Sequence, residues 1–424
     1  MRKINALERQ RKVYLDGATG VRQPLPFDFA ALEQIARRKL SPEAWAYIAG
    51  GAGQEKTVAS NSIDLNAWNI VPRMLRNVEV RDTTQRLLGL ALPAPFFLAP
   101  IGVLEMAHPA ADLAVASAAA GLGIPFIFSN QASFPMEACA AEMGTGPRFF
   151  QLYWSRSDEL VVSFLQRAEA CGCSAIVVTL DTTMLGWRIR DLEMGSLPFL
   201  QGMGIAQYTS DPVFRQLMKT PEQGAKQRSP LTLQAIATLI GTARRYPGSF
   251  WKNLLSGAGL RAVRTFIQLY SRPNITWTDL PFLRKHTTLP IILKGILHPD
   301  DARKALDYGV DGIYVSNHGG RQVDGAISTI GALPAIVEVV REKVPVLIDG
   351  GFRGGADAFK ALALGATAIG IGRPYCYALA AGGQPGVTAL LSNWIAEFEL
   401  TMGLAGCKNV GEIRHATLVN TPQF

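Results

Sequence analysis

Residues 345–372 of the chain read PVLIDGGFRGGADAFKALALGATAIGIG. This stretch opens with one short apolar run, Pro345–Asp349, and closes with another, Thr367–Ile371. Neither run alternates apolar with polar residues, which is typical of strands buried on both faces of a parallel sheet. The residues between the runs suffice for one helix and two loops. The stretch therefore predicts a strand, a crossover helix and a second, parallel strand.

The same pattern recurs along the rest of the chain. Further apolar runs of this kind are Phe96–Ala99, Pro125–Ser129, Arg148–Leu152, Ala175–Asp181, Pro290–Lys294 and Gly312–Ser316. Eight strands that alternate with helices predict an α/β fold, the (β/α)8 TIM barrel. A doubly wound sheet is the alternative, but its dinucleotide fingerprint is absent, because Gly370-Ile371-Gly372 continues into Arg373-Pro374.

Two segments do not follow this alternation of strands and helices. Residues 1–90 precede the first strand, and we expect a helical N-terminal extension packing on the barrel, helical from Phe27 to about Gly50. The connection between the fourth and fifth strands is unusually long, and such connections are usually functional lids or disordered insertions. We therefore expect a TIM barrel over 91–424, with a lid or insertion at 190–280. Residues 300–306, DDARKAL, predict a regular crossover helix with acids at its start.

Composition narrows the class of protein. The chain has 424 residues, of which 48% are hydrophobic and 18% charged, as in a core-forming globular protein. The five cysteines form no CxxC pair and the histidines are scattered, so we expect no metal site. An odd cysteine count and the lack of a recognisable secretory signal lead us to expect a reducing, cytoplasmic location.

The net charge of +8 is concentrated in one segment. Between Gly224 and Thr278 there is no acidic residue, whereas basic residues occur at Lys226, Arg228, Arg244, Arg245, Lys252, Arg261, Arg264 and Arg272. The rest of the chain is close to balanced, which gives no support for nucleic-acid binding.

Two apolar stretches, Leu231–Ala243 and Phe250–Tyr270, lie within this basic segment. In the second, Ala262, Phe266 and Leu269 recur at helical spacing, with arginines on a neighbouring face. A cationic amphipathic helix can lie on an anionic membrane. It can equally pack its apolar face on the barrel mouth or on a neighbouring subunit. We favour packing, because a lid must cover a site that excludes water.

Polar and titratable residues stand at the carboxyl ends of most predicted strands. In a TIM barrel these ends meet at one face, where the reactive groups of such enzymes lie. One such ending is weak support, but seven together are hard to explain by packing. The endings are Ser129-Asn130, Gln151, Thr179 to Asp181 with Arg188 beyond, Lys294, Ser316 to Gln322, Asp349 to Arg353, and Gly372-Arg373.

Each of these residues also has a structural interpretation. His318 alone could be a hydrogen-bonded loop histidine. In Asn-His-Gly-Gly-Arg, however, the glycines let the backbone approach a flat ligand, and Arg321 offers a carboxylate-shaped fork. Asp181 could cap a helix or orient a histidine base. Lys294 could be a surface lysine, although the end of an apolar strand favours pairing with an anion. Tyr47 and Tyr153 are by default core aromatics.

The glycine-rich loops after the seventh and eighth strands give a stronger signal. In barrels, such loops form a recurrent phosphate cradle from backbone N–H groups and a helix N-terminus. Arg353 and Arg373 would complete the cradle, whereas two plain glycine turns would leave both arginines unexplained.

Several of these segments resemble the FMN-dependent L-2-hydroxy acid oxidising enzymes, a family that includes glycolate oxidase, lactate oxidase and lactate 2-monooxygenase. The resemblance covers roughly 30–210 and 275–415. The segments that carry it are residues 291–295, 316–322, 348–366 and 371–374. Residues 181–192, 198–200 and 211–214 are most similar to the lactate 2-monooxygenase branch.

The resemblance implies a role for each strand-end residue. His318 is the active-site base and Asp181 its partner. Arg321 and Arg188 hold the substrate carboxylate, helped by the hydroxyls of Tyr47 and Tyr153. The residues implied at the flavin ring are Pro100, Ile101, Gly102, Ser129, Gln151, Thr179, Lys294 and Ser316. Those implied at the ribityl chain and phosphate are Asp349, Gly350, Gly351, Arg353, Gly372 and Arg373.

The expected function is therefore oxidation of an L-2-hydroxy acid such as lactate by an FMN enzyme, with O₂ as acceptor. Oxidative decarboxylation and the choice between hydride and carbanion chemistry stay open. One alternative is a membrane-associated dehydrogenase that reduces quinone. Another is a non-catalytic flavin- or phosphate-binding barrel, against which the intact set of His318, Arg321 and Asp181 argues. Relatives suggest a homo-oligomer, by analogy a tetramer.

Overall fold

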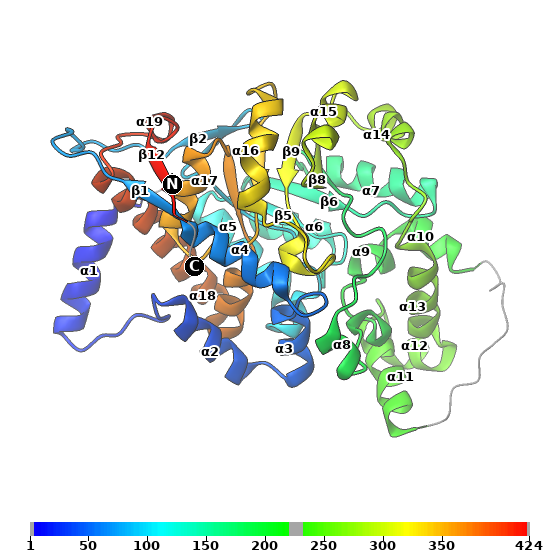
Figure 1. The fold of residues 1–424 in the computed structure, drawn as a ribbon. Coiled ribbons are helices and arrows are strands. Elements are labelled where there is room, and N and C mark those ends of the chain that lie inside the picture. The colour runs from blue at the N-terminus through cyan, green and yellow to red at the C-terminus, as the bar shows by residue number, and fades with distance from the viewer. Residues whose placement is uncertain (1–3, 220–231, 422–424) are drawn as a thin grey trace.

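The computed structural model describes residues 4–219 and 232–421. Its centre is a closed barrel of parallel strands in the order β10-β11-β4-β5-β6-β7-β8-β9 (Figure 1). The prediction of a TIM barrel is confirmed, and the strand ends differ from the predicted ones by at most two residues. The barrel strands are β4 Phe96–Leu98, β5 Phe126–Phe128, β6 Arg148–Leu152, β7 Ile176–Thr179, β8 Ile291–Ile296, β9 Gly312–Val315, β10 Val346–Ile348 and β11 Ala368–Ile371.

The barrel interior is a packed core and not a channel. Inward-facing side chains such as Phe97, Ile127 and Phe149 form one fully buried cluster. The hairpin of β2 (Gln85–Leu87) and β3 (Leu90–Leu92) adds Leu87 and Leu92 to this cluster. Because the interior is filled, a ligand must bind outside the carboxyl ends of the strands.

Helices pack around the barrel and bury the outer faces of the strands. The helix predicted at 300–306 is present as α15 (Pro299–Asp307). The long helix α18 (Arg373–Leu404) has non-helical residues at Gly382 and Gly383. The other helices of this layer, with two short 3₁₀ turns, are α5 Ala111–Leu122, α6 Met136–Met143, α7 Asp158–Ala170, α14 Leu280–His286, α16 Thr329–Val340, α17 Gly355–Ala363, η1 Leu104–Met106 and η4 His318–Gly320.

The N-terminal segment differs from expectation in one respect. The segment expected to be helical from Phe27 to about Gly50 consists of two helices, α2 and α3, because the chain breaks at Ser41. Pro42 disfavours a helical conformation in the residue before it, and the Ser41 hydroxyl caps α3 instead, at 3.2 Å from the N–H of Ala44. The elements here are α1 Ala6–Ala18, α2 Phe29–Lys39, α3 Pro42–Ala49, α4 Lys56–Ala67 and β1 Trp68–Val71, which pairs with β12 Thr417–Asn420 beyond α19 Val410–Ile413.

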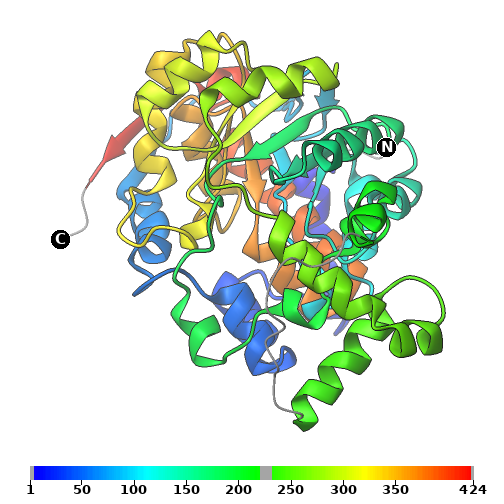
Figure 2. The ribbon, with the colours of Figure 1, turned by 90° about the vertical axis from the view of Figure 1, so that its right-hand side faces the viewer.

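The long connection between β7 and β8 is mostly helical. Figures 1 and 2 show its green helices on the same side of the barrel as the blue helices α2 and α3, and α8 contacts α3. Its elements are α8 Ile189–Glu193, η2 Pro198–Gln201, α9 Ala206–Thr209, α10 Pro212–Leu217, α11 Leu233–Arg245, α12 Phe250–Ser256, α13 Ala258–Leu269 and η3 Trp277–Asp279.

Within this connection, the apolar face of α13 packs into the protein. Ala262 and Phe266 are fully buried, and the Phe266 ring lies 4.8 Å from that of Tyr208 and 5.3 Å from that of Phe199. The face that could have rested on a membrane is therefore occupied by core contacts. In the described part of the chain, no helix is both long and apolar enough to cross a bilayer. Lys226, Arg228 and Leu231 lie outside the described residues.

Candidate active site

A cleft with about 1110 Å³ of empty space, its mouth included, opens at the carboxyl ends of the barrel strands. It gathers most of the site residues expected from the sequence. Those that line it are Tyr47, Pro100, Ile101, Gly102, Tyr153, Arg188, Lys294, His318, Arg321, Asp349, Gly350, Gly351, Arg353, Gly372 and Arg373. The remaining five do not line the cleft and lie buried or half-buried behind its wall: Ser129, Gln151, Thr179, Asp181 and Ser316.

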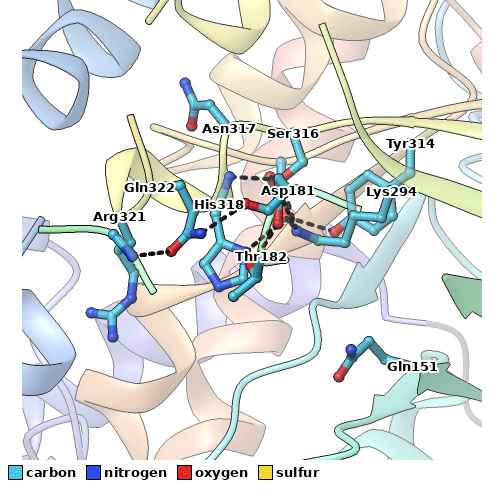
Figure 3. Close-up of polar contacts among 12 residues, drawn as sticks. Gln151, Asp181, Thr182, Lys294, Tyr314, Ser316, Asn317, His318, Arg321 and Gln322 are labelled. Carbon is cyan, nitrogen blue, oxygen red and sulfur yellow. Dashed lines mark hydrogen bonds and ion pairs between the residues drawn. The ribbon is translucent and has the colours of Figure 1, made fainter. Parts of the chain in front are cut away.

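His318 and Asp181 form a hydrogen-bonded pair, although they come from different strand ends. The Nδ1 atom of His318 lies 2.8 Å from Oδ1 of Asp181, and Thr182 Oγ1 is within 3.1 Å of both atoms (Figure 3). His318 begins the turn η4 after β9 and has φ of +57°, in the left-handed region. Its N–H donates to Ser316 Oγ at 3.1 Å, which helps to hold this strained conformation.

The electrostatics of this pair favour a neutral imidazole and an ionised carboxylate. Burial lowers the pKa of His318, and the charge of Asp181 offsets burial only in part. Burial alone would raise the pKa of Asp181, but His318, Lys294 and hydrogen bonds outweigh it and hold that pKa well below its usual range. Nδ1–H then donates to Asp181, which leaves a lone pair on Nε2. The pair can therefore accept a proton from a ligand in the cleft.

Lys294 is a buried cation beside this pair. Its Nζ donates to Ser316 Oγ at 2.8 Å, and it lies 3.8 Å from Asp181 and 3.7 Å from Asp349. Asp349 is held in turn by the hydroxyls of Ser316, at 2.6 Å, and Tyr314, at 2.8 Å. The network fixes a positive charge in the floor of the cleft, where it can face an anionic ligand group.

Arg188 and Arg321 form the first of two arginine clusters. The Arg321 guanidinium stacks on the Tyr47 ring at 4.8 Å, and Arg188 Nε donates to the carbonyl of Arg321 at 3.2 Å. Burial and the neighbouring Arg321 lower the pKa of Arg188 to about 10. Within the described residues neither arginine makes an ion pair. Burial raises the pKa of Tyr153, so its hydroxyl stays a donor. Two buried guanidinium groups and a phenol donor together can bind a carboxylate.

Arg353 and Arg373 form the second cluster, next to the glycine-rich loops. Arg373 donates to the carbonyls of Ile48, Gly319 and Gly50 at 2.7–3.0 Å, and burial lowers its pKa to about 10. Arg353 stacks on Phe29 at 4.1 Å. In the described part of the chain no carboxylate pairs with either arginine. Beside them, a Cβ on Gly372 would meet no protein atom within 4 Å. This end of the cleft fits a phosphate.

The residues present therefore fit FMN. Behind the wall of the cleft lie two buried polar atoms that have no hydrogen-bond partner within the described structure, Gln151 Nε2 and Thr179 Oγ1. Buried polar atoms are rarely left unpaired, so these two suit the polar edge of a flavin ring. Lys294 adds the positive charge that such a ring edge binds.

Part of the cleft wall lies outside the predicted strand ends. Thr182, Leu185, Phe199 and Tyr270 also line the cleft, and all four come from the connection between β7 and β8. In the sequence, Tyr270 is only the last residue of an apolar stretch, and the apolar pattern does not indicate which way its side chain faces. Gln322 was noted as part of a strand ending, but its contacts were not foreseeable.

Comparison with known proteins agrees with this geometry. Residues 36–420 match the model of the FMN-dependent dehydrogenase family. The chain is 39% identical over 410 residues to the FMN-dependent alpha-hydroxy acid dehydrogenase qulF of Penicillium citrinum, covering 96% of this chain and 94% of that protein. It is 38% identical over 396 residues to an L-lactate oxidase of Lysinibacillus sphaericus, covering 93% of each.

Solved structures extend the comparison. A crystal structure of mandelate oxidase with (S)-4-hydroxymandelic acid is 36% identical, with a TM-score of 0.77, and the match covers 93% of this chain and 99% of that one. The match to the family model spans the barrel and the residues that line the cleft. The chain therefore belongs to the FMN-dependent dehydrogenase family.

Proposed function

We propose that this protein oxidises an L-2-hydroxy acid of the lactate type and passes the electrons to O₂. The observation that carries the proposal is the His318–Asp181 pair, 2.8 Å apart, in a cleft shared with the guanidinium groups of Arg188 and Arg321, which pair with no carboxylate among the described residues. A base and a carboxylate site side by side are what a 2-hydroxy acid requires. The names of the relatives, which include oxidases of lactate and of mandelate, support this substrate class.

In this proposal the chain's residues bind the acid and move one proton. The substrate carboxylate lies on Arg321 and Arg188, with the hydroxyls of Tyr47 and Tyr153 beside it. Nε2 of His318 takes the proton of the substrate hydroxyl. Asp181 stays ionised because its pKa is so low, and its charge stabilises the imidazolium that forms.

FMN, when bound, supplies the two-electron acceptor that no side chain can provide. Gln151, Thr179, Ser129 and Lys294 would hold its ring, and the second arginine cluster with Gly351 and Gly372 its phosphate. The proposal also includes a cytoplasmic location and a homo-oligomeric state.

We also propose that residues 190–280 act as a lid, and this leads to an expectation about products. Phe199 and Tyr270 from this segment wall the cleft, which Gly102 also lines. A 2-oxo acid and H₂O₂ formed there would be held together and react, because peroxide converts pyruvate into acetate, CO₂ and water. With L-lactate in air we expect acetate to accompany or replace pyruvate, as measured by NMR of the reaction mixture.

Catalase separates the two routes to acetate. Acetate that forms inside the cleft persists when catalase is added, whereas acetate that forms after release disappears. Stoichiometric pyruvate and free H₂O₂ without acetate would make the protein a simple oxidase. Failure of L-lactate and of (S)-mandelate to bleach the yellow holoenzyme without air would contradict the proposed substrate class.

A second candidate function, electron transfer to a membrane quinone, rests on helix α12. Trp251 and Leu255 of this helix are 68% and 88% exposed and flank the exposed Lys252. Aromatic and aliphatic side chains beside a cation are typical of a segment that rests on an anionic bilayer. The core contacts of α13 argue for the lid and against this role.

We expect the protein to stay in the supernatant when it is sedimented with anionic liposomes at low salt. Attraction to such a surface weakens with ionic strength, so a parallel run at high salt identifies any charge-driven binding. If the protein pellets at low salt, and Trp251→Ser with Leu255→Ser releases it, quinone becomes the acceptor to assay. Leu404→Ser, at an equally exposed position far along the chain, is the matched control.

A further inference from the structure

Gln322 follows Arg321 and uses its whole side-chain amide. Nε2 donates to the carbonyl of Asp181 at 2.7 Å and to that of Met184 at 2.9 Å. Oε1 accepts from the N–H of Gly186 at 3.3 Å and from Nη2 of Arg188 at 3.1 Å. A primary amide has two donors and two acceptor positions, so every position is filled. Figure 3 shows Gln322 beside His318 and Arg321.

All four partners belong to residues 181–188, the segment that follows β7, whereas Gln322 follows β9. The amide therefore ties two strand-end loops together across the end of β8. The approach is close: a Cβ on Gly186 would lie 2.5 Å from the carbonyl oxygen of Arg321 and 2.9 Å from Cα of Gln322. Only a residue without a side chain allows the two loops to meet this way.

The bridge ends on the guanidinium of Arg188. Its Nε donates to the carbonyl of Arg321 and its Nη2 to Gln322, so two consecutive residues fix the plane of the group. Both acceptors are neutral. They orient the buried guanidinium of Arg188 without cancelling its positive charge. A glutamate in place of Gln322 would cancel that charge. The remaining N–H groups of Arg188 are left for a ligand in the cleft.

We propose that Gln322 is a positioning residue, which sets the orientation of Arg188 toward the substrate carboxylate. The inference rests on the proposed function, because it takes Arg188 as a carboxylate ligand. A glutamine that merely packed two loops together would affect stability. A positioning glutamine also sets the affinity for a carboxylate, and it does so through Arg188.

The test uses the FMN-loaded enzyme and 2-hydroxy-2-methylpropanoate, which has the carboxylate and hydroxyl but no α-hydrogen to lose. Its dissociation constant is measured by calorimetry for the wild type, Gln322→Met, Gln322→Glu and Arg188→Lys. Gln322→Met removes all four hydrogen bonds at similar volume. We expect it to weaken binding about tenfold, the scale of one misplaced charge-assisted hydrogen bond. We expect KM for the substrate to rise similarly while kcat changes little, because carboxylate binding is common to ground and transition states.

Gln322→Glu keeps the two hydrogen bonds that Oε1 accepts, but it loses the two that Nε2 donates and adds a charge beside Arg188. If Gln322 only holds the loops, both variants lose stability while the dissociation constant of the folded holoenzyme changes little, whereas positioning of an uncancelled charge predicts that Gln322→Glu weakens binding at least as much as Gln322→Met. Gln85→Met is the matched control, since Gln85 Nε2 donates to the carbonyl of Thr367 at 2.9 Å, just before β11 and at the opposite end of the barrel. We expect wild-type affinity from it.

The double variant Gln322→Met with Arg188→Lys tests whether Gln322 acts through Arg188. If Gln322 acts through Arg188, adding Gln322→Met to Arg188→Lys weakens binding no further. Additive effects, or wild-type affinity in Gln322→Met or Gln322→Glu, overturn the inference and leave the proposed function standing. If the wild type does not bind the acid, or if Arg188→Lys binds it equally well, the proposed carboxylate site falls and the inference with it.

Discussion

His318→Ala should slow reduction of the flavin by the 2-hydroxy acid by about 10²- to 10⁴-fold, the usual contribution of a positioned general base. FMN binding should survive, because the phosphate cradle and the unpaired atoms of Gln151 and Thr179 lie on other elements. The measurement is stopped-flow absorbance of the holoenzyme mixed with substrate in the absence of air. Flavin content per protein, read from the same spectrum, checks that the variant is loaded.

The pH profile of the wild type gives an independent view of the same group. Only neutral His318 can accept the proton, and burial holds its pKa below the ordinary value of a histidine. The rate should therefore be level at neutral pH and fall only as the pH drops through that lowered pKa. In His318→Ala the rate of flavin reduction should be low at every pH, and it should no longer fall as the pH drops. His415→Ala, at an exposed histidine, is the matched control. Normal bleaching of His318→Ala by substrate would remove His318 from the role of base.

The sequence predicted the barrel well because its strands are buried on both faces. Runs such as Val346–Ile348 are continuously apolar, and that pattern depends little on the rest of the fold. The same logic placed the polar strand ends in one cleft, since parallel strands must end at the same face. His318, Arg321 and Asp181 were therefore expected at one site before their distances were known.

Site residues that do not stand at the end of a barrel strand were not predictable from the sequence. Tyr270 and Phe199 reach the cleft from helical segments of the long connection, and helical spacing marks an apolar face without saying what covers it. The contacts of Gln322 depend on how two loops meet across β8, which no local pattern encodes. The break at Ser41, by contrast, has a local cause in Pro42, which disfavours a helical conformation in the residue before it.

Gly372→Val should abolish tight FMN binding while leaving the polypeptide folded. A Cβ on Gly372 would meet no protein atom within 4 Å, although the residue lines the cleft beside Arg373. The added side chain would therefore enter the space of the phosphate and not that of a neighbouring residue. We expect the dissociation constant for FMN to rise about 100-fold or more, since the phosphate would lose its approach to the backbone N–H groups. Fluorescence quenching of FMN titrated with the stripped protein measures this constant.

The same substitution at other glycines shows why Gly372 is the informative position. Gly351 has φ of +87° and its Cβ would lie 2.4 Å from the carbonyl oxygen of Asn61, so a variant there would disturb the fold and the cofactor together. Gly121→Val, which enters open space on α5 away from the cleft, controls for the change of residue. Gly372→Val and wild type, both without FMN, should melt at similar temperatures. Wild-type FMN affinity in Gly372→Val would mean that the phosphate lies elsewhere, and the assignment of Arg353 and Arg373 as its cradle would fail with it.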